Sequence, residues 1–182
     1  MENKEELQKV LGTLDGLLQQ TNLEDVTSES AGFDELPDGY YLCEVEKANL
    51  TTSKASWQPM VAFQFKVSDD GYNAELDGEE VNITRISKTK NRKVFIYYTL
   101  KDETSVKRFV TDMLKFEGEN PGEPLLGKEY FTNSQLLEDA LEVLIGMQIY
   151  IKINTSEKND GSTSTWRNLI SWKRAAALEL PV

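Results

Sequence analysis

The sequence contains no histidine and a single cysteine among its 182 residues. A catalytic triad that uses histidine and a zinc site with histidine ligands are therefore excluded. One thiol also cannot form an internal disulfide or complete a thiolate metal site. Cys43 lies in a predicted strand, so we expect it to be a small buried hydrophobic side chain and not a reactive thiol. We expect no metal and no other cofactor.

Long apolar runs are missing as well. No stretch approaches the roughly 18 consecutive apolar residues that mark a membrane span. The N-terminal residues, MENKEELQKV, are charged where a secretory signal would be apolar. We therefore expect a cytoplasmic protein without a membrane partner.

Positive charge is scarce, with 20 lysines and arginines against 31 aspartates and glutamates and a net charge of -11. At first sight this balance argues against a nucleic-acid partner. The charge is uneven, however: residues 1–37 hold nine acidic and two basic side chains, whereas residues 83–115 hold nine basic and three acidic ones. The chain therefore combines an acidic arm of charge -7 with a central region of charge +6.

Leucine and valine recur at helical spacing along residues 3–20, which predicts an amphipathic helix. This apolar stripe has to be buried, either against the rest of its own chain or against a second copy. Residues 21–33 have the composition of a flexible acidic linker. We expect residues 1–32 to form the N-terminal helix and linker, residues 33–174 a domain and residues 175–182 a short tail. The stripe comprises Leu7, Val10, Leu11, Leu14, Leu17 and Leu18.

The most regular alternation in the chain predicts two strands joined by a short polar loop. The turn Pro37-Asp38-Gly39 starts the first strand, residues 40–50, and residues 51–56 form the loop. In the second strand apolar residues alternate with more polar ones, so one face is strongly apolar and the other is wet. The apolar positions are Val61, Phe63, Phe65 and Val67.

Residues 69–80 are acidic and punctuated by glycine, and we interpret them as a solvated turn. Their spacing does not match the Asp-x-Asp-x-Asp-Gly pattern of a calcium loop. Residues 81–86 are a short candidate strand, and the alternation over residues 93–100 predicts another. The basic run over residues 85–93 is the only long stretch of positive charge without an intervening carboxylate.

Two helices and two further strands complete the pattern. The helices span residues 103–117 and 133–145, and the strands span residues 147–153 and 164–173. With the short candidate strand over residues 81–86 not counted, the order of three strands, two helices and two strands is that of an OB-fold with one extra helix. We therefore predict a mainly β protein with accessory helices. Its core is a five-stranded OB-fold barrel with two helices between strands 3 and 4, preceded by the N-terminal amphipathic helix.

OB-fold barrels bind oligonucleotides on the face of strands 2 and 3, flanked by the loops that join strands 1–2 and 4–5. Bases stack on aromatic rings, and phosphates need lysine or arginine nearby. The sequence places aromatic and basic side chains at all three positions. The candidate nucleic-acid-binding residues are Trp57, Lys66, Arg85, Lys88, Lys90, Arg92, Lys93, Phe95, Tyr97, Trp166 and Arg167.

Each of these candidates also has a purely structural interpretation. Trp57, Trp166 and Trp172 are large enough to fill a core or to plug the end of a barrel. Phe95 and Tyr97 can pack under the N-terminal helix, and the basic run can be a solvated loop. The nucleic-acid hypothesis therefore depends on the convergence of these residues in one place.

The segment FDELPDGYYLCEVEKANLTTSKASWQPMVAFQFKV resembles the start of phage-encoded single-stranded DNA-binding proteins. Those proteins carry a Leu-Pro-x-Gly-x-Tyr motif at the first strand, a Ser/Lys-rich loop and an apolar second strand. Leu36, Pro37, Gly39 and Tyr41 match the motif, and residues 146–172 resemble the C-terminal hairpin of the family. The resemblance implies an OB core that acts in phage DNA replication or recombination in the bacterial host cytoplasm. Many of those proteins end in an acidic tail that recruits partners, whereas the acidic arm here is N-terminal.

Together these observations predict a non-catalytic protein that binds single-stranded DNA with little sequence preference. We expect a homo-oligomer formed through the N-terminal helix or the barrel, with phage replication or recombination proteins as further candidate partners. The alternative is a phage accessory or structural protein whose β-barrel docks a protein partner. An enzyme would need a carboxylate pair such as Asp69 and Glu80 to hold a metal, and nothing in the sequence places the two together.

Overall fold

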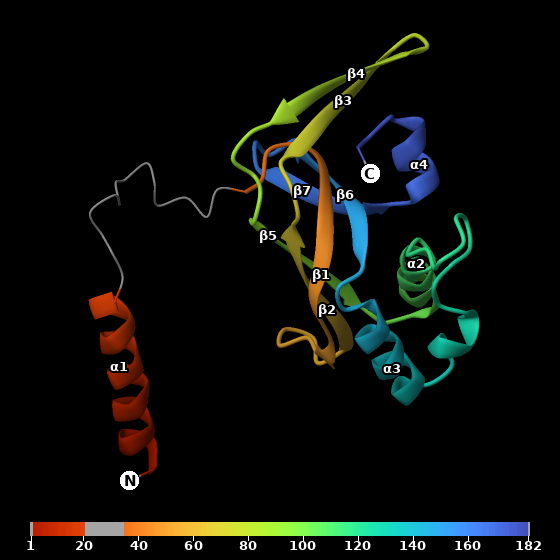
Figure 1. The fold of residues 1–182 in the computed structure, drawn as a ribbon. Coiled ribbons are helices and arrows are strands. Elements are labelled where there is room, and N and C mark those ends of the chain that lie inside the picture. The colour runs from red at the N-terminus through yellow and green to blue at the C-terminus, as the bar shows by residue number, and fades with distance from the viewer. Residues whose placement is uncertain (1, 21–34, 182) are drawn as a thin grey trace. The chain divides into compact units, whose positions relative to one another are not determined.

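The computed structural model describes residues 2–20 and 35–181. These residues form seven strands, four α-helices and one 3₁₀-helix, which confirms a mainly β protein with accessory helices. The chain divides into two compact units, Met1–Glu35 and Leu36–Val182. In chain order (Figure 1) the elements are α1 (Glu2–Gln20), β1 (Gly39–Thr52), β2 (Pro59–Val67), β3 (Gly71–Asp77), β4 (Glu80–Ile86), β5 (Lys93–Thr99), α2 (Glu103–Met113), η1 (Lys128–Phe131), α3 (Ser134–Leu144), β6 (Gln148–Glu157), β7 (Thr163–Ile170) and α4 (Trp172–Ala177).

The first unit contains α1, which confirms the helix predicted over residues 3–20. The burial of its apolar stripe, against the barrel or against a second copy, stays a prediction. The predicted acidic linker over residues 21–33 lies outside the described residues. None of the described helices has the length and apolar character that crossing a membrane requires.

The second unit is organised around β1, a long strand with different partners at its two ends (Figure 1). Its first half pairs with β6, where Tyr41 lies opposite Ile151. Its second half pairs with β2, where Leu50 lies opposite Val61. Because β5 extends the sheet from β2 and β7 extends it from β6, the strands follow the order β5-β2-β1-β6-β7, all antiparallel.

A closed five-stranded barrel is not confirmed. Within residues 35–181 β5 pairs with β2 alone and β7 pairs with β6 alone, so the sheet is open along this path. Two additional strands, β3 and β4, form a hairpin that extends away from the rest of the sheet in Figure 1. This hairpin joins the sheet at one residue pair, in which Tyr40 of β1 lies opposite Tyr72 of β3.

The interpretation of residues 69–80 as a solvated turn is wrong, because β3 occupies most of that stretch. In the hairpin Leu76 lies opposite Val81, and Gly78 turns the chain with a φ of +66°. Tyr72, Ala74 and Leu76 alternate with polar residues, which is itself a strand pattern. The dipeptide Asp77-Gly78, a common hairpin turn, is a second signal that could have revealed the hairpin.

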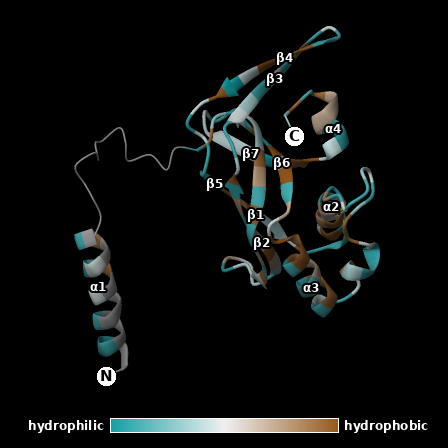
Figure 2. Ribbon diagram, viewed as in Figure 1, coloured by the Kyte–Doolittle hydropathy of each residue, from teal (hydrophilic) through white to brown (hydrophobic). Residues whose placement is uncertain are grey.

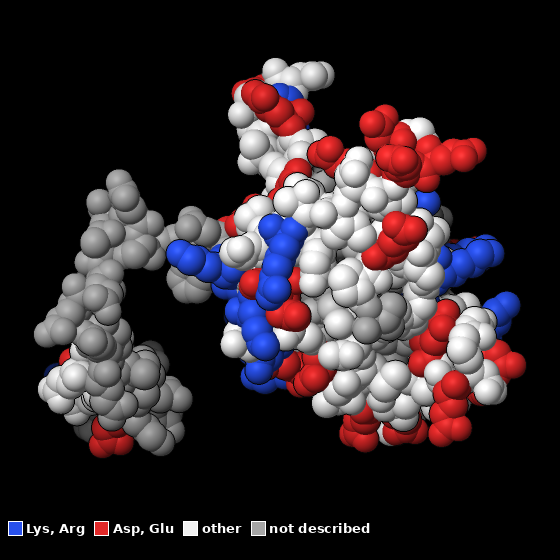
Figure 3. Space-filling view, turned by 45° about the horizontal axis from the view of Figure 1, so that its top comes forward, with Lys and Arg blue, Asp and Glu red and all other residues white. Residues whose placement is uncertain are grey.

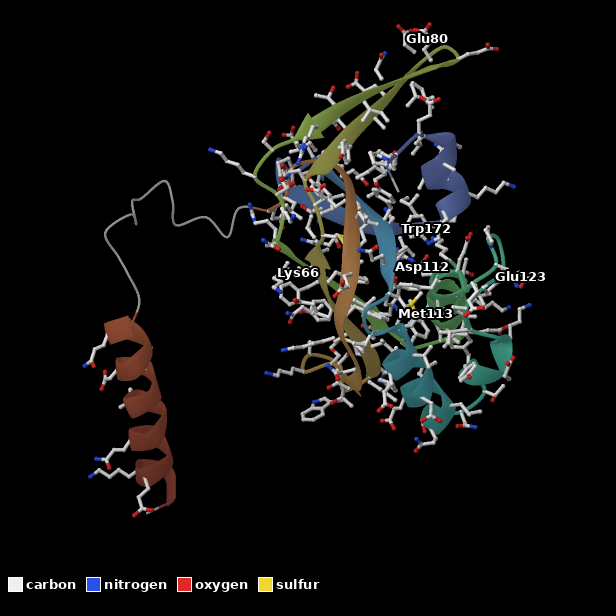
Figure 4. The ribbon with its side chains drawn as sticks, viewed as in Figure 1. Lys66, Glu80, Asp112, Met113, Glu123 and Trp172 are labelled. Carbon is white, nitrogen blue, oxygen red and sulfur yellow. The ribbon has the colours of Figure 1, made fainter. Side chains whose placement is uncertain are left out.

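Asp112 of α2 and Lys115, two residues after the helix ends, link the end strands β5 and β7 of the open sheet. The Tyr98 hydroxyl of β5 donates a hydrogen bond to Asp112 Oδ2 at 2.8 Å. Lys115 Nζ pairs with Asp112 Oδ1 at 2.5 Å and donates to the Leu169 carbonyl of β7 at 2.8 Å. Side-chain hydrogen bonds around α2 therefore connect β5 to β7. In a closed barrel these two strands would be joined by backbone hydrogen bonds. Figure 4 shows Asp112 and the neighbouring Met113 on the side of the sheet away from Lys66.

We expect an Asp112→Ala variant to lose about 1–3 kcal/mol of unfolding free energy, because a partly buried hydroxyl and ammonium lose their acceptor. The side chains of Asp112 and Lys115 are only 15% and 28% exposed. Urea denaturation measures the loss. Glu103→Ala is the matched control, since Glu103 forms a largely exposed pair with Lys107 and its loss should cost less than about 1 kcal/mol. Equal losses in the two variants would contradict a linking role for Asp112.

The main core lies between one face of the sheet and the helices α2, η1 and α3. Phe109 and Met113 of α2 and Leu141 of α3 pack against it. Cys43 is fully buried there, and burial raises the pKa of its thiol, so the expected buried hydrophobic role is confirmed. Figure 2 shows hydrophobic residues along β6 and hydrophilic ones at the tip of the β3–β4 hairpin. The buried strand residues are Tyr41, Cys43, Val45, Val61, Phe63, Phe65, Val67, Val94, Ile96, Ile149, Ile151, Ile153 and Leu169.

A second, smaller cluster lies on the other face of β1 and β6, under the C-terminal residues. The residues expected to form a short tail pack here, with Leu178 and Leu180 almost fully buried against Tyr40 and Tyr150. The last predicted strand is too long, since β7 ends at Ile170 and α4 follows it.

Candidate nucleic-acid interface

The outward face of β1, β2 and β5 brings four of the predicted site residues together. Cross-strand pairing places Lys66 beside Lys93, and Gln64 beside Phe95, while Tyr97 lies beside the small side chain of Ala62. The intervening residues of β2 and β5 point into the main core. The interface therefore carries two rings and two lysines on one face, with Lys66 marked in Figure 4.

Aromatic rings project from this region into solvent. Phe95 is 45% exposed, Tyr97 59% and Trp57 81%. Trp57 lies in the loop between β1 and β2 and has a left-handed backbone, with a φ of +56°. The backbone N–H of Trp57 donates a hydrogen bond to the Ser53 carbonyl at 2.8 Å, and the backbone N–H of Ser53 donates one to the Gln58 carbonyl at 2.8 Å. The loop is therefore fixed at its base, and Trp57 is not a plug of the core.

Strand β1 supplies functional candidates that the sequence did not identify. A shift of register between Val45 and Lys47 makes Glu46 the extra residue of a β-bulge. Lys47 is exposed and lies beside Gln64 on the outward face. No ion pair of Lys47 occurs within residues 35–181. A bulge leaves no clear mark in the sequence, although the alternation of β1 could have suggested Lys47.

Glu46 reaches across the outward face to β2 and β5. Its Oε1 lies 2.5 Å from Lys93 Nζ, and its Oε2 accepts a hydrogen bond of 2.9 Å from Gln64 Nε2. These hydrogen bonds, that of Lys93 first and that of Gln64 second, hold the pKa of Glu46 below its ordinary value. The Glu46 carboxylate is therefore ionised at neutral pH. It neutralises the ammonium of Lys93, which the sequence analysis proposed as a phosphate-binding group.

The basic loop between β4 and β5 is built on Asp70. The Asp70 carboxylate accepts hydrogen bonds from the Thr89 N–H at 2.9 Å and from the Lys90 N–H at 3.1 Å. The Thr89 side chain is buried, and its hydroxyl accepts from the Gly71 N–H at 2.8 Å. The backbone of Lys88 is left-handed, with a φ of +63°. The loop is therefore ordered, while the side chains of Lys88 and Lys90 stay exposed.

The basic run is uninterrupted in sequence but not in space. Arg85 lies 3.2 Å from Asp70 and 3.5 Å from Asp69, and Lys93 is paired with Glu46. Lys88 and Lys90 form no ion pair within residues 35–181, and Arg92 is half-buried with contacts of its own. Figure 3 shows lysines and arginines gathered in a band with acidic side chains beside them.

The hydrogen bonds to Asp70 predict an acid-sensitive loop. The N–H groups of Thr89 and Lys90, in that order, hold the pKa of Asp70 below its ordinary value of 3.8. A lowered pKa means that the stabilisation is present above pH 3.8 and is lost as the pH falls through the lower, folded value. We expect the amide NMR signals of Thr89 and Lys90 to titrate with a midpoint below 3.8 and to lose this transition in Asp70→Asn. A midpoint above the ordinary value would contradict the hydrogen-bonded carboxylate.

The remaining two candidates, Trp166 and Arg167, lie on β7, and the structure brings them together neither with each other nor with the rings and lysines of β2 and β5. Trp166 is 50% exposed and pairs with Asn154, and its Nε1 donates to Ser156 Oγ at 3.2 Å. Arg167 pairs with Ile153, whose side chain is in the main core. Because neighbouring strand residues face opposite sides, Trp166 and Arg167 lie on different faces of the sheet.

Trp172 has a structural role. It begins α4, where Figure 4 marks it, and is half-buried. Its ring packs edge-on against Tyr150, with ring centres 5.9 Å apart. Trp172 is therefore partly buried against the second cluster, in contrast to the exposed Trp57.

The carboxylate pair that an enzyme would need is separated in the structure. Asp69 precedes β3 and bonds to Arg85, whereas Glu80 lies at the far tip of the β3–β4 hairpin (Figure 4). Within the described part of the chain no group of three or more Asp, Glu, Cys or His side chains is placed to hold a metal ion.

The outward face can stack bases on exposed rings, meet phosphates with lysines and offer amides to base edges. Comparison with protein-family models finds no match, and a search of curated proteins finds no similar sequence. A proposal about function is therefore based on the geometry of the interface.

Proposed function

We propose that the protein binds single-stranded DNA, without catalysis, through the outward face of β1, β2 and β5 and the loop that follows β1. The observation that carries this proposal is Trp57, whose ring is 81% exposed in a loop closed by backbone hydrogen bonds. An exposed tryptophan on a left-handed backbone contributes little to folding. An exposed ring in the loop that leads into β2, the strand that pairs with Phe95 and Tyr97, is suited to stacking of unpaired bases, since every base has a π-face.

Phosphate binding has a separate source on the same unit. Lys47 and Lys66 lie on the outward face, and the exposed side chains of Lys88 and Lys90 extend from the ordered basic loop. Lysines release bound counterions from the nucleic acid when they neutralise phosphates, which strengthens binding at low salt. Rings and lysines together support binding that tolerates many sequences.

We further propose that β5-β2-β1-β6-β7 is an OB-fold sheet whose end strands are joined through α2. The strand order and the two α-helices between β5 and β6 support this proposal. In OB-folds the face of the second and third strands binds oligonucleotides, and here those strands are β2 and β5. The resemblance to phage single-stranded DNA-binding proteins points to the same face and to a role in phage replication or recombination.

A protein-docking role in a phage accessory or structural protein is the second candidate. It is favoured by one observation, that Arg85 and Lys93 are already neutralised by the protein's own carboxylates. The stripe of α1 would then serve self-association, as it would in an oligomeric DNA-binding protein.

A titration of fluorescently labelled oligo-dT with the full chain, at two salt concentrations, separates the two candidates. We expect an increase in anisotropy and a logarithmic affinity that falls linearly with the logarithm of the salt concentration. Double-stranded DNA of the same length should bind more weakly, because its bases are not free to stack. Absence of oligo-dT binding at low salt would reject the proposed function.

A further inference from the structure

Each exposed ring of β5 shares a cross-strand row with an amide side chain. Gln64 lies directly opposite Phe95, and Asn49 lies in the row of Tyr97, with Ala62 between them. Opposite residues on one face of an antiparallel pair have Cβ atoms about 4.5–5.5 Å apart. A base that stacks on the Phe95 ring would therefore bring its edge close to Gln64.

The orientation of the Gln64 amide is fixed by its partner. An ionised carboxylate can only accept hydrogen bonds, so Nε2 of Gln64 and not its oxygen must face Glu46, at 2.9 Å. Lys93 holds Glu46 in turn, and the β-bulge directs Glu46 across the face. The Gln64 amide oxygen is consequently turned away from the carboxylate and remains an acceptor.

The Gln64 amide oxygen is therefore the acceptor that faces a base beside Phe95. Both carboxylate oxygens of Glu46 already accept hydrogen bonds, from Lys93 and from the Gln64 amide nitrogen. Cytosine presents an amino group at C4, whereas thymine presents a carbonyl oxygen at the same position. The amino group can donate to the Gln64 amide oxygen, whereas the thymine oxygen at the same position is itself an acceptor and cannot.

We propose that Phe95, Gln64 and Glu46 form a base subsite that prefers a base with an exocyclic amino group over thymine. This inference rests on the proposed binding of single-stranded DNA and adds a base preference to it. Phe95 supplies the stacking surface, Gln64 contacts the base edge, and Glu46 positions Gln64. The rest of the interface, including Trp57, stays tolerant of sequence.

The test compares oligo-dC and oligo-dT of equal length, titrated into the full chain at one salt concentration and neutral pH. We expect oligo-dC to bind about two- to tenfold more tightly, which corresponds to one additional hydrogen bond. Gln64→Leu keeps the approximate shape of the side chain but removes the amide, and should bring the ratio of the two affinities close to one. Glu46→Gln frees the Gln64 amide to rotate and should also reduce the ratio. Gln135→Leu, on α3, is the matched control and should keep the wild-type ratio.

The outcomes separate the two proposals. Equal affinities of the wild-type chain for oligo-dC and oligo-dT would overturn the base preference and leave the proposed function intact. A preference that survives in both Gln64→Leu and Glu46→Gln would show that other residues cause it. A chain that binds neither oligonucleotide at low salt would overturn the function together with the subsite.

Discussion

Replacement of Trp57 by alanine is expected to weaken oligo-dT binding by about 1–3 kcal/mol, or roughly 5- to 150-fold, without unfolding the protein. The ring is 81% exposed, so its removal takes little from the core. The dependence of affinity on salt should stay unchanged, because a ring releases no counterions. Titrations at several salt concentrations measure both quantities, and urea denaturation checks the fold.

The left-handed backbone of Trp57 provides an additional control. Glycine adopts a φ of +56° more readily than other residues, so Trp57→Gly should be at least as stable as Trp57→Ala. Trp57→Gly should nevertheless bind oligo-dT as weakly as Trp57→Ala, while Trp57→Phe should keep much of the wild-type affinity. Leu76→Ala is the matched surface variant, since Leu76 is 58% exposed on the β3–β4 hairpin. Wild-type affinity in Trp57→Ala would remove the observation on which the function depends.

The double variant Lys88→Gln and Lys90→Gln should weaken binding to all sequences about equally. It should also reduce the slope of logarithmic affinity against logarithmic salt by roughly 1.4, at about 0.7 for each phosphate that is no longer neutralised. Both side chains are exposed, and neither has an ion pair within residues 35–181, so both can meet phosphates without giving up a partner. Arg85→Gln should change the slope less, since Arg85 already pairs with Asp69 and Asp70.

The control for this variant carries the same change in net charge. The control is the double variant Lys107→Gln and Lys128→Gln. Lys107 lies on α2 and Lys128 on η1, and both helices pack against the opposite face of the sheet. The two substitutions should lower affinity only slightly through the overall charge and leave the slope nearly unchanged. Equal slopes for the two double variants would show that the loop between β4 and β5 does not contact the phosphates.

The strands that carry the interface could be predicted because their alternation is strong. Phe63 and Phe65 on β2, and Val94 and Ile96 on β5, have a period of two that fixes which residues face outward. Of the β3–β4 hairpin only β4 was predicted, as the short strand over residues 81–86, because the many acids and glycines of residues 69–80 favour a solvated turn. Whether the end strands β5 and β7 pair with each other depends on how strongly the sheet curves. The order of strands along the sequence does not determine that curvature.

The electrostatics of the site were largely hidden in the sequence. Counting charges along the chain made residues 85–93 an uninterrupted basic run, because Glu46, Asp69 and Asp70 come from other segments. A bulge at Glu46 shifts the register of β1 by one residue, and no residue type announces such a shift. The exposure of Trp57 was equally undecided, since a tryptophan before a strand suits a core as well as a surface.

The link from β5 through α2 to β7 has a consequence for the order of folding. The β1–β2 pair closes through a short loop, whereas the contact of Lys115 with Leu169 joins residues 54 positions apart. Contacts between distant residues form late, because they require the closure of a large loop. Until α2 docks, the two end strands are not linked to each other, and their unpaired edges can recruit strands of other molecules. We therefore expect Asp112→Ala to aggregate during refolding at concentrations where the wild-type chain stays in solution.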